Sequence, residues 1–182
     1  MTRNPLRALV LLAVSFTAIA LAVPAQAAAP YCGITWGSTA KQAGSSAPSL
    51  RGSELTAVRA GQHACYDRLV LDISGSTRVG SYRVEYVPTV TADGSGAAVP
   101  LRGGAFLQIT VGVDNVSSLP ANTGDVANVS GFRTFRQVSA AGSFEGYTSE
   151  GLGVRARLPF RAFTLSGPGT SVRVVVDVAH RW

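Results

Sequence analysis

The sequence has 182 residues, of which 46% are hydrophobic and 14% charged, and its net charge is +6. This composition excludes disorder of the whole chain, because disorder requires low hydrophobicity together with a high net charge. The length suits one domain and would be short for two. The 20 glycines and nine prolines predict a turn-rich β protein and not an array of helical repeats.

Residues 1–27 have the pattern of an export signal. Arg3 and Arg7 form a short positive segment, an apolar run follows over Ala8–Val23, and Ala25-Gln26-Ala27 fits a signal cleavage site. The apolar run has about 16 residues, fewer than the roughly 20 that span a bilayer. We therefore expect a secreted, extracytoplasmic protein that does not stay in the membrane once the signal is cleaved.

Residues 28–53 are rich in Gly, Ser and Ala and predict a flexible N-terminal arm before a domain over residues 54–182. The arm contains Cys32, and the domain contains Cys65; the chain has two cysteines in total. Because exported proteins fold in an oxidising compartment, we predict a disulfide between the two. Closing this loop would stabilise the fold by roughly 3–4 kcal/mol, because the disulfide lowers the conformational entropy of the unfolded chain.

A zinc site is the alternative use of the cysteines. Cys32, His63, Cys65 and His180 have the side chains that zinc prefers, but the sequence contains no C-x2-C or H-x3-H pair. The two interpretations differ in whether the thiols are oxidised. Beyond this alternative, the sequence points to no metal and no cofactor.

Short strands make up the domain. The clearest is Cys65–Ile73, in which Leu69, Leu71 and Ile73 alternate with outward-facing residues. The predicted strands are Leu55–Arg59, Cys65–Ile73, Tyr82–Val87, Phe106–Val113, Phe132–Val138, Phe144–Thr148, Leu152–Leu158, Ala162–Ser166 and Val172–Val178. No window of twelve residues after the signal has helical periodicity. The fold class is therefore all-β, a sandwich or barrel of short, mostly antiparallel strands.

One pattern occurs twice, as R-L-V-L-D over Arg68–Asp72 and as R-V-V-V-D over Arg173–Asp177. In each strand Arg, Val and Asp share one face, and two aliphatic residues point the other way. One interpretation is ion pairing along or across strands on an exposed sheet surface. The other is that the two are equivalent strands of a pseudo-symmetric sandwich.

The same stretches carry a resemblance to a known family. C-Y-D-R-L-V-L-D-I from Cys65 and R-V-V-V-D-V-A-H from Arg173 resemble the AMIN-like domains of secreted actinobacterial proteins, as do Y-R-V-E-Y-V from Tyr82, S-F-E-G from Ser143 and L-P-F-R-A-F-T-L from Leu158. The resemblance covers Glu54–His180. It implies a β-sandwich of the cell envelope, related to AMIN domains that bind peptidoglycan or direct localisation; no agreed activity comes with it.

No catalytic motif stands out. The chain lacks G-x-S-x-G, H-E-x-x-H and the P-loop pattern. Asp177 and His180 lie three residues apart at a strand end, which favours opposite faces over a catalytic dyad. Glu145 and Glu150 would serve a glycosidase if the fold set them at the required separation, but Glu145 is better suited to a turn or an ion pair with Arg155 or Arg157. We assign no catalytic residue and expect a protein that is not an enzyme.

We expect a cell-envelope binding module whose partner is peptidoglycan or another anionic wall polymer. The candidate binding residues are Arg68 and Arg173, whose forks suit anions, and Trp36 and Tyr66, whose rings suit sugars. Scattered arginines and a modest net charge argue against nucleic acid. The alternatives are a secreted hydrolase that uses carboxylates and an envelope protein that contacts another protein through the long loop Asp114–Val129.

Overall fold

The computed structural model describes residues 30–44, 51–117 and 124–182. The predicted export signal lies outside these residues. The described chain is all-β, as predicted, apart from one turn of 3-10 helix, η1, at Tyr31–Gly33. Within the described ranges, no helix has the length and hydrophobicity needed to cross a membrane.

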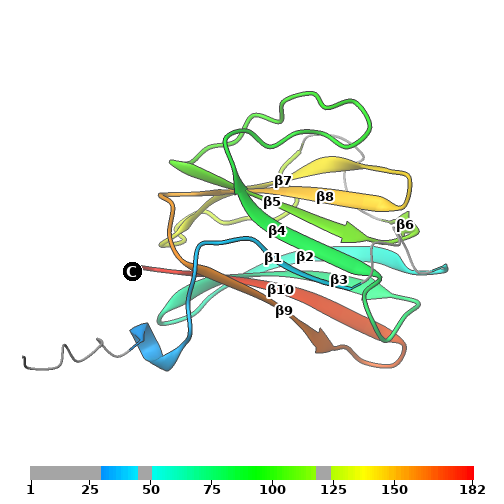
Figure 1. The fold of residues 1–182 in the computed structure, drawn as a ribbon, viewed down its shortest axis with the longest axis horizontal. Helices are drawn as coiled ribbons and strands as arrows, with labels where there is room; N and C mark the ends of the chain where they lie inside the picture. Colours follow the sequence, from blue (N-terminus) through cyan, green and yellow to red (C-terminus); the bar gives the residue numbers. More distant parts are fainter. Residues whose placement is uncertain (1–29, 45–50, 118–123) are drawn as a thin grey trace, which may run out of the picture.

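In the described parts of the chain, ten strands form two sheets that stack face to face (Figure 1). The strands are β1 (Lys41–Gly44), β2 (Glu54–Gln62), β3 (Tyr66–Ser74), β4 (Ser81–Val87), β5 (Ala105–Gly112), β6 (Asn115–Val116), β7 (Phe135–Phe144), β8 (Tyr147–Val154), β9 (Phe160–Ser166) and β10 (Ser171–Ala179). One sheet has the order β1-β4-β5-β8-β7 and the other β6-β2-β3-β10-β9. The short β2–β6 pairing is parallel and the other strand pairings are antiparallel. The predicted β-sandwich is thus confirmed.

The core lies between the sheets and follows from the alternation in the sequence. Leu69, Leu71 and Ile73 of β3 are fully buried and pack with aliphatic residues of β5, β8 and β10. Two tyrosines of β4 also reach across the core. The hydroxyl of Tyr86 donates to the Leu158 carbonyl at 2.7 Å, and that of Tyr82 to the Ala162 carbonyl at 3.2 Å. Their polar ends are therefore paired inside an apolar layer.

The strand boundaries differ from the prediction around one hairpin. The predicted strand Phe144–Thr148 is wrong, because its centre is the turn between β7 and β8. The predicted Leu152–Leu158 ends too late, since β8 stops at Val154. In the turn, Glu145 and Gly146 have φ values of 49° and 80°. Two consecutive left-handed residues between paired strands are typical of a type I′ turn, which the alternation of apolar residues does not reveal.

The arm and the long loop contain more structure than the sequence analysis assigned. Lys41–Gly44 forms β1 on the edge of one sheet, paired with β4. The disulfide between Cys32 and Cys65 is formed as predicted. In the loop Asp114–Val129, the start forms β6, and Asp125 pairs with Ser139 at the edge of β7. The described parts of both segments are therefore attached to the sheets by backbone hydrogen bonds.

Replacing Glu145 by Asn is expected to stabilise the protein. Asn tolerates the left-handed conformation better than Glu, and Asn-Gly is a preferred pair for this turn. We expect Glu145→Asn to raise the free energy of unfolding by roughly 0.5–1 kcal/mol, or the Tm by about 1–4 °C. Glu145→Gln removes the same charge without this backbone preference and should leave the Tm unchanged. Equal Tm values for the two variants would contradict the explanation.

Candidate functional site

The two R-x-V-x-D strands pair with each other. In the antiparallel register of β3 and β10, Arg173 lies opposite Asp72, Asp177 lies opposite Arg68, and Val70 lies opposite Val175 at the centre. Each arginine therefore faces the aspartate of the other motif. This confirms the interpretation of the motif as cross-strand ion pairing, but the expectation of an exposed surface is wrong at Asp177, which is fully buried. The two motifs are related by the local two-fold symmetry of an antiparallel pair.

Asp177 is fully buried and binds two arginines. Arg68 donates from Nε at 2.6 Å and from Nη2 at 2.9 Å, and Arg161 of the edge strand β9 donates from Nε at 2.8 Å. A buried carboxylate is costly unless its charge and lone pairs are satisfied, and these contacts satisfy both oxygens. The arginines thus have a structural role toward Asp177 before any role in binding.

Asp72 forms the second such group, nearer the other end of the same strands. It accepts two hydrogen bonds from Arg59 of β2, at 2.5 and 2.9 Å, and one from Arg173 at 3.2 Å. Burial alone would raise the pKa of Asp72, but the hydrogen bonds and charges of the two arginines outweigh it and hold the pKa below its usual value. Asp72 therefore stays ionised at neutral pH, and both arginines stay fixed on this surface.

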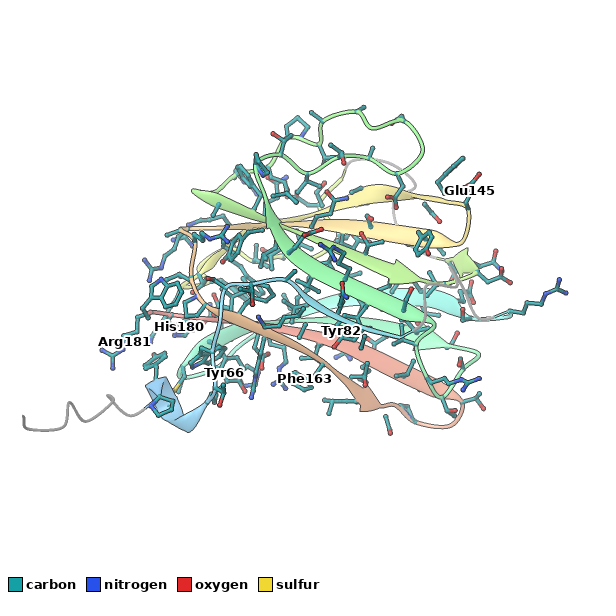
Figure 2. All side chains as sticks on the ribbon, viewed as in Figure 1. Tyr66, Tyr82, Glu145, Phe163, His180 and Arg181 are labelled. Atoms are coloured by element: carbon teal, nitrogen blue, oxygen red, sulfur yellow. A yellow bond between two sulfur atoms is a disulfide. The ribbon has the colours of Figure 1, made fainter. Side chains whose placement is uncertain are left out.

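Aromatic rings surround the group at Asp177. The guanidinium of Arg161 lies over the rings of Phe163, Tyr66 and Trp36, at 5.0, 5.5 and 5.6 Å from their centroids. That of Arg68 lies over the ring of Tyr66 at 5.2 Å. Tyr66 and Phe163 are labelled in Figure 2 at this sheet. We call the outward side of β2, β3, β10 and β9, with both aspartate groups and these rings, the arginine face.

The structure brings together three of the four predicted binding residues. Trp36, Tyr66 and Arg68 gather around Asp177, and the ring centroids of Trp36 and Tyr66 are 6.0 Å apart. Arg173 lies on the same face but belongs to the Asp72 group. It is separated from Asp177 along β10 by about 13 Å, calculated from the rise per residue of a β-strand. Sequence reasoning missed Arg161 and Phe163 as members of the cluster. Arg161 and Phe163 are two residues apart in β9, so their side chains share one face of the strand. This spacing is the signal that could have placed both on the outward side.

The candidate dyad Asp177–His180 does not form. Asp177 binds the arginines outside the sheet, whereas His180 is buried and its Nε2 lies 3.0 Å from Oδ1 of Asp67. The other oxygen of Asp67 accepts the backbone N–H groups of Thr134 and Phe135, at 2.6 and 3.1 Å. The sequence analysis missed Asp67, although its alternation with Leu69 places it on the apolar side of β3. This buried pair joins the end of β10 to the start of β7.

The zinc interpretation is also wrong. The sulfurs of Cys32 and Cys65 are bonded to each other and cannot act as thiolate ligands. The ring of His63 stacks on Tyr66 at 4.6 Å, and His180 is held by Asp67. In the described parts of the chain, no group of three or more His, Cys, Asp or Glu side chains is arranged to hold a metal.

Glu145 and Glu150 do not share a cleft. Glu145 is exposed in the β7–β8 turn, as a turn residue was predicted to be, whereas Glu150 is 1% exposed. The arginines predicted as ion partners of Glu145 bind elsewhere: Arg155 donates to the His180 carbonyl and Arg157 to the Ser38 carbonyl. The register places Glu150 opposite Ile109, on the core side of β8. A glycosidase pair requires two carboxyl groups that reach one substrate, and these two do not.

Glu150 is unusual because its buried Oε2 has no hydrogen-bond partner. Burial first, and the negative charge of Asp93 second, raise the pKa of Glu150 to about 8. The carboxyl group is therefore mostly protonated at neutral pH and sits in the core without a charge.

One family of known proteins matches most of the chain. The family model described as the AMIN-like domain matches residues 53–180. The match runs from the start of β2 to the end of β10 and includes both R-x-V-x-D strands. It confirms the resemblance drawn from the motifs. No curated protein and no solved structure gives a significant match.

Stability should depend on pH through Glu150. The folded protein binds this proton more tightly than the unfolded chain, in which the pKa is near 4.5, so the stabilising effect is complete below about pH 4.5 and lost as the pH rises through 8. Relative to Glu150→Gln, wild-type stability should fall by up to about 1.4 kcal/mol per pH unit between these values. Urea unfolding at pH 5, 6.5 and 8 measures this difference.

The matched control for this experiment is Glu145→Gln, which removes a carboxylate from the exposed turn. Its stability should follow that of the wild type at all three pH values. A constant difference between wild type and Glu150→Gln would show that Glu150 does not bind its proton more tightly in the folded state.

Proposed function

Because the chain belongs to the AMIN-like domain family, we propose that it is a secreted, non-enzymatic module of the cell envelope that binds peptidoglycan or another anionic wall polymer through the arginine face. Membership of the family supports the coarse class, a cell-envelope module. The disulfide Cys32–Cys65 agrees with an extracytoplasmic location, since disulfides persist in oxidising compartments.

The charge of the arginine face is the observation that carries the proposal. Four guanidinium groups surround two carboxylates, which leaves these two groups together with an excess of two positive charges. Arg59 is 57% exposed, and Arg173, Arg161 and Arg68 are partly exposed. The face therefore attracts anions even though each guanidinium also binds an aspartate.

The aromatic rings add a second kind of contact. Trp36, Tyr66 and Phe163 are partly exposed beside Arg68 and Arg161. Rings next to cations suit a polymer that combines sugars with negative charges, because sugars offer C–H groups for stacking and the anions pair with guanidinium.

A carboxylate-dependent hydrolase has less support. Of its two candidate glutamates, Glu145 is exposed in the β7–β8 turn and Glu150 is buried on the core side of β8. Both aspartates of the arginine face are engaged by arginines. The pKa of Asp72 is held below its usual value, so this carboxylate is not suited to donate a proton at neutral pH.

Co-sedimentation with purified peptidoglycan tests wall binding. The bound fraction should fall as salt rises, because the exposed charges of the arginine face are screened. Arg59→Gln/Arg173→Gln removes two exposed charges and should weaken binding by about three- to tenfold, or roughly 0.7–1.4 kcal/mol. This pair is preferable to Arg68→Ala, which would leave the fully buried Asp177 with one arginine and destabilise the fold. Arg68→Lys tests the role of Arg68, since it keeps the charge but loses the fork.

The control is Arg78→Gln, which also removes one positive charge. Arg78 lies in the turn between β3 and β4, outside the arginine face. Its sedimentation should stay close to that of the wild type. Absence of sedimentation at low salt would end the proposal. Equal sedimentation of the double variant and the wild type would remove the Asp72 group from the binding surface, and salt-independent binding would favour the rings over the arginines.

A further inference from the structure

A pocket of about 520 Å³ lies at one end of the molecule, beside the C-terminal residues. Its walls include Tyr31, Ile34, Trp36, Pro159, Arg181 and Trp182. In Figure 2, Arg181 and His180 lie at the end of the molecule where η1 is found, and Glu145 lies at the opposite end. All of these wall residues except Pro159 lie outside the segment that matches the AMIN-like domain. Most of the pocket wall therefore lies outside the segment that matches the family domain.

Two distant parts of the chain build the pocket. The first is the arm, which the disulfide holds against Cys65 and in which the Trp36 indole N–H donates to the Tyr31 carbonyl at 2.8 Å. The second is the segment after β10, fixed by a hydrogen bond of 2.9 Å from the His180 N–H to the Cys65 carbonyl. The Trp182 indole N–H then donates to the Arg157 carbonyl at 3.3 Å. The pocket is thus held by one covalent bond and several hydrogen bonds.

The aromatic side chains of the pocket present surface to solvent. Trp182 is 70% exposed, the most exposed of the large hydrophobic side chains in the described structure. Tyr31 and Trp36 are partly exposed. Rings in this state offer flat faces on which the C–H groups of a pyranose ring can stack, and their indole and phenol groups tolerate the water around a sugar.

Arg181 supplies the charge of the pocket. Its guanidinium lies 4.6 Å from the centroid of the Tyr31 ring. Unlike Arg68 and Arg161, it makes no ion pair or hydrogen bond with a described residue, and no acidic side chain lines the pocket. A guanidinium held on an aromatic ring with its N–H donors unused is arranged to bind a carboxylate in the plane of its fork.

From these features we infer that the pocket binds a pyranose that carries a carboxylate, the sugar class of an acidic glycan. Stacking on Trp182 and Tyr31 would position the ring, and Arg181 would bind the carboxylate. This inference rests on the proposed function, to which it adds a sugar class and a site distinct from the arginine face.

Tryptophan fluorescence tests the inference directly, because the chain has two tryptophans and both line the pocket. The probes are N-acetylmuramic acid and N-acetylglucosamine, which differ by the lactyl carboxylate of the first. We expect a saturable change in emission with N-acetylmuramic acid and at least tenfold weaker binding of the neutral sugar. Arg181→Gln should remove this preference, whereas Arg78→Gln should keep it. Reduction of the disulfide should weaken binding of the acid, because it removes the covalent bond that holds the Tyr31 end of the arm against Cys65.

Two substitutions at Trp182 complete the test. Trp182→Phe keeps a ring and should retain most of the affinity, and Trp182→Ala should lose at least tenfold; in both variants Trp36 still reports binding. No emission change with either sugar, or equal responses to both, would overturn the inference.

Failure here is distinguishable from failure of the proposed function. If neither sugar changes the emission while the protein still sediments with peptidoglycan in a salt-dependent manner, the pocket inference fails and wall binding stands. If N-acetylmuramic acid binds but the protein does not sediment, the pocket inference stands and the arginine face loses its proposed role.

Discussion

The pairing of β3 with β10 determines much of the remaining structure, and opposite charges fix its register. The apolar alternation of each strand already prevents a slip by one residue, because such a slip would turn the core residues outward. A slip by two residues would keep the faces but separate the fully buried Asp177 from Arg68 and leave it with Arg161 alone, which would destabilise the fold. The contacts that exclude this second slip are Asp72–Arg173, Arg68–Asp177 and Asp67–His180.

This structural role shapes what the arginine face can do as a binding surface. Arg68 and Arg161 give their best donors to Asp177, so a polymer on this face meets the outer edges of guanidinium groups that are already engaged. Such contacts supply attraction that depends on salt and little directional selectivity. Arg181 differs, because no described carboxylate competes for its donors. In the proposed function, the face would supply general attraction for an anionic polymer, and the pocket would select among sugars.

Most of the sandwich could be predicted from the sequence, because apolar residues recur at every second position in strands such as β3. The prediction failed where backbone geometry or a neighbouring strand decides the structure: the Glu145–Gly146 turn interrupts an apparently continuous β pattern, and Lys41–Gly44 becomes a strand by pairing with the edge of β4. In the site, the R-x-V-x-D repeat indicated ion pairing but not the partners. Arg161 comes from a separate edge strand, and Asp67 and Glu150 are polar residues at core positions, where alternation alone predicts apolar side chains.

The pocket at the chain ends depends on the same strand pairing. Cys65 directly precedes β3 and His180 directly follows β10, so the register that sets Asp177 opposite Arg68 also sets these two residues side by side, with a backbone hydrogen bond of 2.9 Å between them. The disulfide of Cys65 then carries the arm, and His180 leads into Arg181 and Trp182. Both halves of the pocket are thus attached to one end of a single strand pair. Segments outside the family domain can in this way acquire a defined position without a core of their own, because the β3–β10 pair supplies one point of attachment to each half of the pocket.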